Sequence, residues 1–384
     1  MRSHRFSLAE IPRQDVLAVN HPNAASMEQI PQMTNVASNA TRQPGWPISV
    51  YADEIYPLEV GIEPGLALLN RFGVKLTDLR VVNGRDSFLR LTDPELTALS
   101  LALKKYNIEV GALETPIFKC PLRKNNSINW GDSLGLDDDL RYGEHLELLS
   151  RAFAIADRLG AREVRCFSFW REYDFEEAFD EVVEKLAAAA ERARAAGHRL
   201  YVENEQDTLA GTGVELARIL KAVGSPHLTG AYNLGNSARL GGIPYPDDYG
   251  ALKGLLGHVL VKFQAIDVRC GLAHGDADRS GPRCPDFAYY FWHQRSLPIS
   301  GWVQIGENRF EIKGPRTFLP LEETVGVDYR SFFRALKQDG YDGSITADIN
   351  CFIPGAGATS NPEVEANFEK ALASLRKLIA EVWS

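Results

Sequence analysis

Four short apolar segments of the sequence end in a polar or charged residue that could do chemistry. The segment 200–205 contains the carboxylate of Glu203 at the end of its apolar core, and three later segments end at Asn233, Lys262 and Asp348. Two carboxylates can remove and return a proton, and an ammonium group can stabilise a developing negative charge. If these segments are parallel strands of one barrel, their ends meet at its C-terminal edge, where catalytic groups of such barrels lie. We therefore expect one site that contains all four residues.

The elements that must bring these residues together follow an alternating pattern of strands and helices. The expected strands are the apolar segments 48–53, 79–82, 108–113, 164–167, 200–205, 229–233, 258–262 and 344–348. Most of the helical segments between them stop at a glycine, which takes the left-handed conformation that ends a helix. Strands with nearly continuous apolar cores are typical of a parallel sheet buried on both faces. The sequence thus predicts an α/β protein with a single (β/α)8 TIM barrel.

The domain organisation predicted from the sequence is one barrel with an arm and an insertion. Residues 1–46 are rich in Asn, Pro, Ser, Ala and Gln and are expected to form an irregular N-terminal arm. The barrel is expected over residues 47–384, with a long insertion, 264–327, after its seventh strand. Two alternating segments around Glu307-Asn308 predict a hairpin within the insertion. Because the insertion leaves from the C-terminal edge, we expect a lid or a subunit contact.

Composition excludes several classes of function. The net charge of −9 argues against nucleic-acid binding, which normally requires a basic surface. No apolar run approaches the roughly 20 residues of a membrane-spanning helix. The five cysteines are odd in number and widely spaced, so the sequence predicts neither a disulfide framework nor a zinc knuckle. We expect a cytoplasmic protein that does not bind nucleic acid or membrane.

Several motifs, in their order and spacing, resemble those of one family of enzymes. They lie at residues 91–95, 114–119, 165–169, 202–205, 223–228, 232–236 and 340–343. Together they resemble the sugar phosphate isomerase/epimerase family of xylose isomerase-like TIM barrels, with a likeness that runs from about residue 48 to about residue 352. The resemblance implies an isomerase, epimerase or related lyase with a small sugar or polyol as its substrate. The resemblance also leaves open a homo-oligomer or a partner subunit, since certain family members act together with a partner protein.

The same resemblance implies a divalent metal site that this sequence has altered. The family holds its metal with a glutamate, an aspartate, a histidine and a second glutamate, and these positions fall on Glu203, Asn233, Leu260 and Asp348. A hard cation requires about six oxygen or nitrogen donors, so this set predicts a weak or absent site. We expect no tightly bound cofactor and at most weak Mn, Mg or Zn. His258 precedes Leu260 by two residues, so on a strand it would lie about 6 Å deeper.

The chemistry implied by the resemblance is proton abstraction beside a carbonyl. Glu203 is the expected base, Asp348 its partner on the opposite face, and Lys262 the group that stabilises the oxyanion. A structural ion pair between Lys262 and Glu203 is the alternative for that lysine. A catalytically silent barrel that binds a carbohydrate or a partner subunit is the alternative for the whole protein. A nuclease is disfavoured because its several metals require more histidines.

Further residues near predicted strand ends are candidates for substrate binding. They are Asn83, Lys119, Trp170, Arg171 and Asn236. The amides could bind hydroxyl groups, the cations could bind hydroxyls or a phosphate, and the indole could stack on a sugar ring. The alternatives are surface solvation for the two cations and core packing for Trp170.

Overall fold

The computed structural model describes most of the barrel. The described residues are 45–54, 61–82, 87–123, 140–161, 163–172, 174–240, 242–263, 302–306, 309–312, 320–323, 327–349 and 362–384 of the 384-residue chain. Nearly all of the expected N-terminal arm and most of the 264–327 insertion lie outside them.

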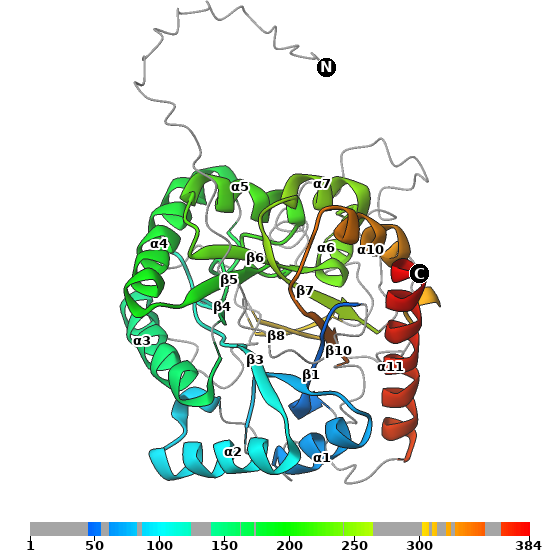
Figure 1. Cartoon of the computed structure of the whole chain (residues 1–384). Helices are drawn as coiled ribbons and strands as arrows, with labels where there is room; N and C mark the ends of the chain where they lie inside the picture. The colour runs from blue at the N-terminus through cyan, green and yellow to red at the C-terminus, as the bar shows by residue number, and fades with distance from the viewer. Residues whose placement is uncertain are drawn as a thin grey trace, which may run out of the picture. The chain divides into compact units, whose positions relative to one another are not determined.

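Eight parallel strands close into a barrel (Figure 1). In sheet order they are β1 (Ile48–Tyr51), β10 (Ile345–Asp348), β7 (Leu256–Lys262), β6 (Leu228–Asn233), β5 (Arg199–Glu203), β4 (Glu163–Cys166), β3 (Glu109–Leu113) and β2 (Leu76–Leu79). Each strand pairs in parallel with both neighbours, and β1 closes the ring by pairing with β2 and β10. The predicted (β/α)8 fold is therefore confirmed.

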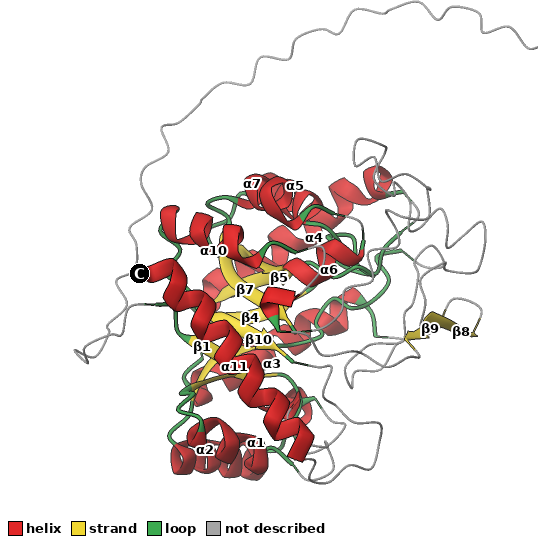
Figure 2. Ribbon diagram, turned by 90° about the vertical axis from the view of Figure 1, so that its right-hand side faces the viewer, coloured by secondary structure: helices red, strands yellow, loops and turns green. Residues whose placement is uncertain are grey.

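Helices surround the strands, as Figures 1 and 2 show. They are α1 (Glu63–Arg71), α2 (Asp93–Tyr106), α3 (Tyr142–Leu159), α4 (Phe175–Ala196), α5 (Gly213–Val223), α6 (Leu234–Arg239), α7 (Tyr249–Leu252), α10 (Tyr329–Gln338) and α11 (Pro362–Trp383). Shorter helical turns are η1 (Ala52–Glu54), η3 (Phe88–Arg90), η4 (Pro244–Asp248) and η5 (Leu321–Glu323). Among the helices in the described ranges, none is long and apolar enough to cross a membrane.

The predicted hairpin of the insertion is present. Strands β8 (Trp302–Gly306) and β9 (Arg309–Ile312) pair antiparallel, with Trp302 opposite Ile312. Apart from this hairpin and residues 320–323 and 327, the insertion lies outside the described residues, so its role as a lid or a subunit contact stays a prediction.

Side chains from alternate strands fill the centre of the barrel. Tyr51 of β1, Ala112 of β3, Tyr201 of β5 and Leu260 of β7 are buried together, with Ala231 of β6 beside them. This arrangement, here called the middle layer, matches the layered interior of such barrels, in which alternate strands contribute to each layer. The residues that follow these along the strands reach the C-terminal edge.

The position of the second strand corrects one prediction. The expected strand was 79–82, whereas β2 covers Leu76–Leu79. Asp78 lies in the middle of β2 and is fully buried, so the apolar pattern is interrupted where the strand runs. Its carboxylate accepts hydrogen bonds from the Thr346 hydroxyl and the Ala112 backbone. A charged residue in a buried strand is stable only with such partners, which come from distant segments.

The structure also adds a helix directly after β6. Helix α6 begins at Leu234, and the side-chain oxygen of Asn233 caps it by accepting a hydrogen bond from the backbone N–H of Asn236 at 3.4 Å. The helix that follows η4, α7, is only a single turn. Asn233 is therefore both the last residue of a strand and the N-cap of a helix, which orients its amide group.

Candidate functional site

The four residues selected at strand ends lie on neighbouring strands. Glu203, Asn233, Lys262 and Asp348 are the last residues of β5, β6, β7 and β10, which are consecutive in the barrel. All four side chains are buried, with at most 5% of each residue exposed. The predicted placement is confirmed, and these four residues are called the lip cluster below.

Hydrogen bonds connect the lip cluster into one network. The Lys262 ammonium lies 2.8 Å from Asp348 Oδ2. The amide nitrogen of Asn233 donates to Glu203 Oε1 at 2.9 Å and lies 3.4 Å from Asp348 Oδ2. Lys262 thus pairs with Asp348, whereas the structural alternative placed it against Glu203.

The cation that pairs with Glu203 is Arg165, which the sequence analysis did not select. Its Nη1 atom lies 2.7 Å from Glu203 Oε2 and 2.7 Å from Glu114 Oε2. Arg165 lies in β4 between Val164 and Cys166 and is buried. A charge inside a predicted buried strand was the available signal, because such a residue requires a partner within the barrel.

Glu114 lies at the end of β3 and holds a proton more tightly than an ordinary carboxyl group. Burial raises the pKa of Glu114 to about 8, and the nearby Arg165 guanidinium only partly offsets this effect. The Tyr201 hydroxyl donates a hydrogen bond to its Oε1 atom. The site therefore combines two ion pairs, Lys262–Asp348 and Arg165–Glu203, with one carboxyl group that titrates near neutral pH.

Asn236 lies next to the lip cluster, as its place in the motif predicted. Its amide nitrogen donates to the backbone oxygen of Asn204 at 2.9 Å and lies 3.4 Å from Glu203 Oε1. Asn204 in turn accepts a hydrogen bond from the backbone N–H of Asn233 at 2.7 Å. The two loops after β5 and β6 are joined by these amides, which hold the Glu203 carboxylate in place. A role of Asn236 in binding substrate stays a prediction.

Lys119 and Trp170 pack against each other beside the site. The Lys119 ammonium lies 4.6 Å from the centre of the Phe167 ring and 5.7 Å from that of Trp170, and 3.7 Å from Glu205 Oε2. Trp170 is 1% exposed, which favours the packing alternative for its indole. Substrate contact by either residue stays a prediction, and Asn83 lies outside the described residues.

Arg171 is held at the start of α5. Its Nη2 atom lies 2.6 Å from Glu215 Oε1, and Nη1 donates to the backbone oxygen of Thr208 at 3.1 Å. Glu215 also completes the capping box of α5 with Thr212. This geometry favours a structural role for Arg171 over both substrate binding and surface solvation.

The donors of the lip cluster do not fit a divalent metal ion. The oxygen of the Asn233 amide caps α6, and its nitrogen faces the two carboxylates. Lys262 presents an ammonium group, which has no lone pair to donate. Leu260, at the position of the family's histidine, is buried in the middle layer and offers no ligand atom. The Asn233 amide and the Lys262 ammonium therefore already contact the carboxylate oxygens that a metal ion would need as ligands.

A second set of metal-type side chains lies deeper in the barrel. Ligand atoms of Asp78, Glu114 and His258 lie within 4.8 Å of one another. His258 Nε2 lies 3.2 Å from Asp78 Oδ2 and 2.8 Å from the Thr346 hydroxyl oxygen. Burial lowers the pKa of His258, but the hydrogen bond and charge of Asp78 outweigh it and raise this pKa to about 9. His258 and Asp78 form a buried pair in this arrangement, and the three side chains would hold a metal ion only with His258 in its neutral form. Asp78, His258 and Thr346 are called the deep cluster below.

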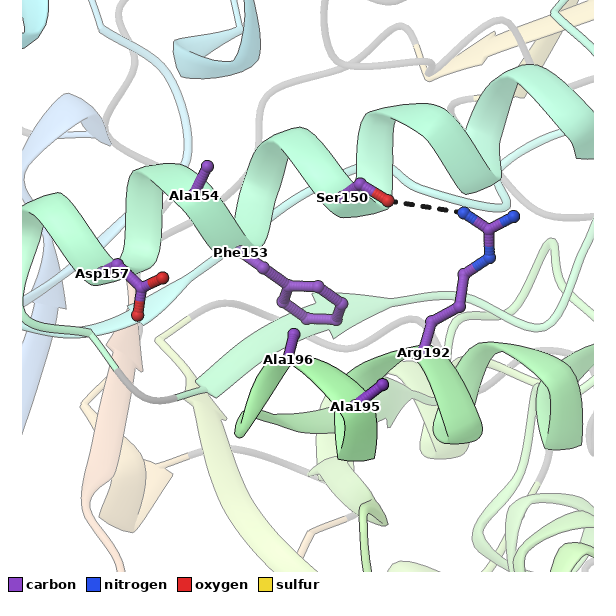
Figure 3. A pocket seen from close by; sticks show the side chains of 7 residues that line it. All are labelled: Ser150, Phe153, Ala154, Asp157, Arg192, Ala195 and Ala196. Atoms are coloured by element: carbon purple, nitrogen blue, oxygen red, sulfur yellow. Dashed lines mark hydrogen bonds between the residues drawn. The ribbon is translucent and has the colours of Figure 1, made fainter.

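A surface depression on the outside of the barrel lies between α3 and α4 (Figure 3). The Arg192 guanidinium on one side lies 3.4 Å from the Ser150 hydroxyl on the other, and Asp157 accepts a hydrogen bond from His198. Its polar groups pair with each other across the two helices. The depression is therefore a helix–helix contact, separate from the lip cluster.

The fold and the position of the lip cluster define a (β/α)8 barrel with its polar site at the C-terminal ends of the strands. The family model described as xylose isomerase-like TIM barrel matches residues 66–378, so the chain belongs to that family. This confirms the resemblance found in the sequence. No curated protein matches the chain.

Several solved structures share the fold at low sequence identity. The IOLI protein with a bound zinc atom is 12% identical, with a TM-score of 0.57, over 88% of this chain and 99% of that one. A D-allulose 3-epimerase from Methylomonas sp. is 16% identical, with a TM-score of 0.52, over 88% and 99% of the two chains. A xylose isomerase-like protein from Mycobacterium smegmatis in complex with magnesium is 16% identical, with a TM-score of 0.51, over 87% and 98%. At these identities the likeness shows the fold.

Proposed function

We propose that the protein is a sugar or polyol isomerase or epimerase that uses the Lys262 ammonium in place of a metal ion. The observation that carries the proposal is the Lys262–Asp348 ion pair, 2.8 Å long, within a lip cluster whose other carboxylate is Glu203. Family membership supports the substrate class, because neighbours in fold include an epimerase acting on D-allulose. Proton transfer beside a carbonyl requires a base and an electrophile, and both residue types are present.

The proposed reaction passes through an enediolate. Glu203 removes the proton from the carbon beside the substrate carbonyl, and the C–H electron pair moves to the carbonyl oxygen. The Lys262 ammonium donates a hydrogen bond to this developing oxyanion. Return of the proton to the former carbonyl carbon, while the hydroxyl proton of the neighbouring oxygen moves to the oxyanion, gives isomerisation. Delivery of a proton to the original carbon from the opposite face, by Asp348 in its protonated form, gives epimerisation, and exchange with solvent then returns both carboxyl groups to their starting states. Arg165 and Asn233 keep the Glu203 carboxylate oriented throughout.

Solvent deuterium exchange tests this proposal. The full chain is incubated in D2O with a panel of ketoses and aldoses, and deuterium uptake at the carbon beside the carbonyl is measured by NMR. We expect uptake with at least one sugar, and Lys262→Met should lower its rate by about 10²- to 10³-fold, the usual loss on removing an oxyanion donor. Lys253→Met is the control, because Lys253 pairs with Asp339 on the surface. Equal rates in wild type and Lys262→Met would exclude the mechanism.

Metal dependence is measured in the same preparation. We expect elemental analysis to find substoichiometric Mn, Zn and Mg and the exchange to resist a chelator. The variant Asn233→Asp with Leu260→His restores two ligand positions of the family, and replacing Lys262 by Met in that variant removes the competing cation. Metal occupancy should rise from wild type to the double and then to the triple variant. One tightly held ion per wild-type chain would contradict the metal-free mechanism.

A catalytically silent barrel that binds a carbohydrate is the second candidate. The observation that favours it is that three side chains, those of Arg165, Asn233 and Asn236, contact the Glu203 carboxylate. A base with both oxygens engaged must exchange one of these contacts for the substrate. Binding of a sugar without deuterium uptake into any member of the panel would support this candidate.

A further inference from the structure

We infer that the site binds an uncharged, hydroxyl-rich compound, an unphosphorylated sugar or polyol, and that the Tyr51 hydroxyl contacts it. The inference rests on the proposed function for the identity of the site and adds the substrate class and one substrate-contacting residue. Two observations carry it independently: polar atoms at the site that lack a partner, and cations that are all engaged.

The Tyr51 hydroxyl is the first of these polar atoms. Tyr51 is the last residue of β1 and is 1% exposed, and its hydroxyl has no hydrogen-bond partner among the described residues. Its neighbours in the middle layer include Tyr201, whose hydroxyl bonds Glu114, so the Tyr51 ring lies beside the site. A buried hydroxyl without a partner costs free energy, and proteins keep such groups where a ligand completes them.

The ring of Tyr51 is fixed in this orientation. The Arg80 guanidinium lies 4.9 Å from the centre of the ring, and Arg80 is itself held by Asp53 at 2.9 Å. The ring also belongs to the middle layer, in which it packs with Tyr201 and Leu260. Packing on several sides therefore positions the hydroxyl before any ligand binds, which lowers the entropy cost of binding.

Asn236 supplies the second unpartnered atom. Its side-chain oxygen is buried without a hydrogen-bond partner in the described part of the chain, while its nitrogen bonds Asn204 and approaches Glu203. Tyr51 offers a donor that can also accept, and Asn236 offers an acceptor. Both lie near the Glu203 carboxylate. A ligand that satisfies them must carry both donors and acceptors, as neighbouring hydroxyl groups do.

The cations around the site argue against a phosphate group on this ligand. Each of five described cations near the strand ends contacts a carboxylate: Arg80 with Asp53, Lys119 with Glu205, Arg165 with Glu114 and Glu203, Arg171 with Glu215, and Lys262 with Asp348. A phosphate would have to displace a carboxylate from one of these pairs and then face the released negative charge. An uncharged ligand leaves every pair intact.

Binding measurements with matched sugars test the inference. The full chain is titrated by calorimetry with D-fructose, D-ribulose and D-allulose and with the terminal phosphate ester of each. We expect an unphosphorylated member to bind more tightly than its ester. Tyr51→Phe, which removes only the hydroxyl, should weaken that binding at least tenfold while its unfolding midpoint stays equal to or above that of wild type. Tyr142→Phe is the control, because the Tyr142 hydroxyl bonds the Lys185 backbone outside the barrel.

The other outcomes either overturn the inference or separate it from the proposed function. Tighter binding of an ester excludes the substrate class, and no binding of any member excludes a sugar site. Unchanged affinity in Tyr51→Phe would show that the hydroxyl does not contact the ligand. A lower unfolding midpoint in that variant would show that the hydroxyl has a structural role. Binding that depends on Tyr51 without deuterium exchange supports the inference and contradicts the proposed function. Deuterium exchange that depends on Lys262 but not on Tyr51 supports the proposed function and contradicts the inference.

Discussion

The deep cluster and the edge of the barrel around the lip cluster differ in how their side-chain oxygen atoms are paired, although one imidazole nitrogen of the deep cluster, His258 Nδ1, also has no hydrogen-bond partner among the described residues. In the deep cluster, Asp78 accepts hydrogen bonds from Ala112 and Thr346 and lies 3.2 Å from His258. At the lip, the Tyr51 hydroxyl and the Asn236 oxygen have no partner among the described residues. A buried network with its carboxylate fully engaged stabilises the fold, whereas unpartnered atoms indicate a place for a ligand.

Tyr201 of the middle layer contacts residues near both clusters. His258 stacks on its ring with the ring centres 4.7 Å apart, and its hydroxyl bonds Glu114, which Arg165 joins to Glu203. Substitutions in the deep cluster should act mainly on stability, because its groups have no part in the proposed proton transfer. Substitutions in the lip cluster should act mainly on binding and proton transfer.

The largest expected effect follows from removing the Asp78 carboxylate of the deep cluster. Asp78→Ala leaves the His258 imidazolium and the Thr346 hydroxyl without their acceptor in a buried place. We expect the free energy of unfolding in urea to fall by about 3–5 kcal/mol, the usual cost of breaking a buried ion pair. Asp93→Ala, which breaks an exposed pair with Arg158, should cost about 1 kcal/mol or less. Equal losses of unfolding free energy in the two variants would show that the buried pair contributes no more to stability than the exposed pair.

The pH dependence of stability should come from His258 and Glu114. The pKa of His258 rises from 6.5 to about 9 on folding, so its stabilisation is complete below pH 6.5 and is lost as pH rises through 9. The pKa of Glu114 rises from 4.5 to about 8, because burial disfavours its charged form, so stability also falls from pH 4.5 to 8. Urea unfolding between pH 6 and 9 should show this decline, and His258→Gln should flatten it. A parallel decline in the variant would mean that His258 is not protonated in the folded state.

Two tyrosines of the middle layer compare a hydroxyl that has a hydrogen-bond partner with one that has none among the described residues. Tyr201→Phe removes the donor to Glu114 and should lower the free energy of unfolding by about 1–3 kcal/mol. Tyr51→Phe removes a hydroxyl with no such bond and should leave this free energy unchanged or raise it. Thermal and urea unfolding of both variants measure the difference. If Tyr51→Phe were the more destabilising, its hydroxyl would have a structural partner and the contrast would fail.

The smallest expected change in stability is at Gly235, which lies against the stem of Lys262. A Cβ atom there would lie 3.0 Å from Lys262 Cδ and 3.2 Å from Lys262 Cβ. In Gly235→Ala the gain in helix propensity offsets this close contact, so stability should change by less than about 1 kcal/mol. Deuterium exchange should nevertheless slow, because the ammonium is displaced. Gly250→Ala in α7 is the control, since its Cβ would meet nothing within 4 Å, and equal exchange rates in both variants would show that the Lys262 position is not critical.

Much of the fold could be predicted because its signals are local. The helices at 175–196 and 213–223 each end at the residue before a glycine, Gly197 and Gly224, and the helix at 362–383 begins at a proline. The ends of β5, β6, β7 and β10 were found because an apolar run followed by a polar residue needs no knowledge of distant segments. The class of barrel and the members of the lip cluster thus follow from the sequence alone.

Buried charges could not be interpreted in the same way. Asp78 interrupts the apolar pattern of β2, and its partner Thr346 lies 268 residues further along the chain. Arg165 joins Glu114 and Glu203 from two other strands. Such residues appear unfavourable in a strand until their partners are known, because burial penalises a charge that is not paired.

The sequence by itself determined that Glu203, Lys262 and Asp348 meet at one edge of the barrel, because each ends an apolar run. The tertiary structure alone decided which of them form a pair. The order of the strands places β10 beside β7, and their register sets Lys262 opposite Asp348, whereas β6 separates Lys262 from Glu203. The pairing and register of β7 and β10, which no local pattern encodes, therefore bring Lys262 to Asp348, and Glu203 pairs with Arg165 of the adjacent β4.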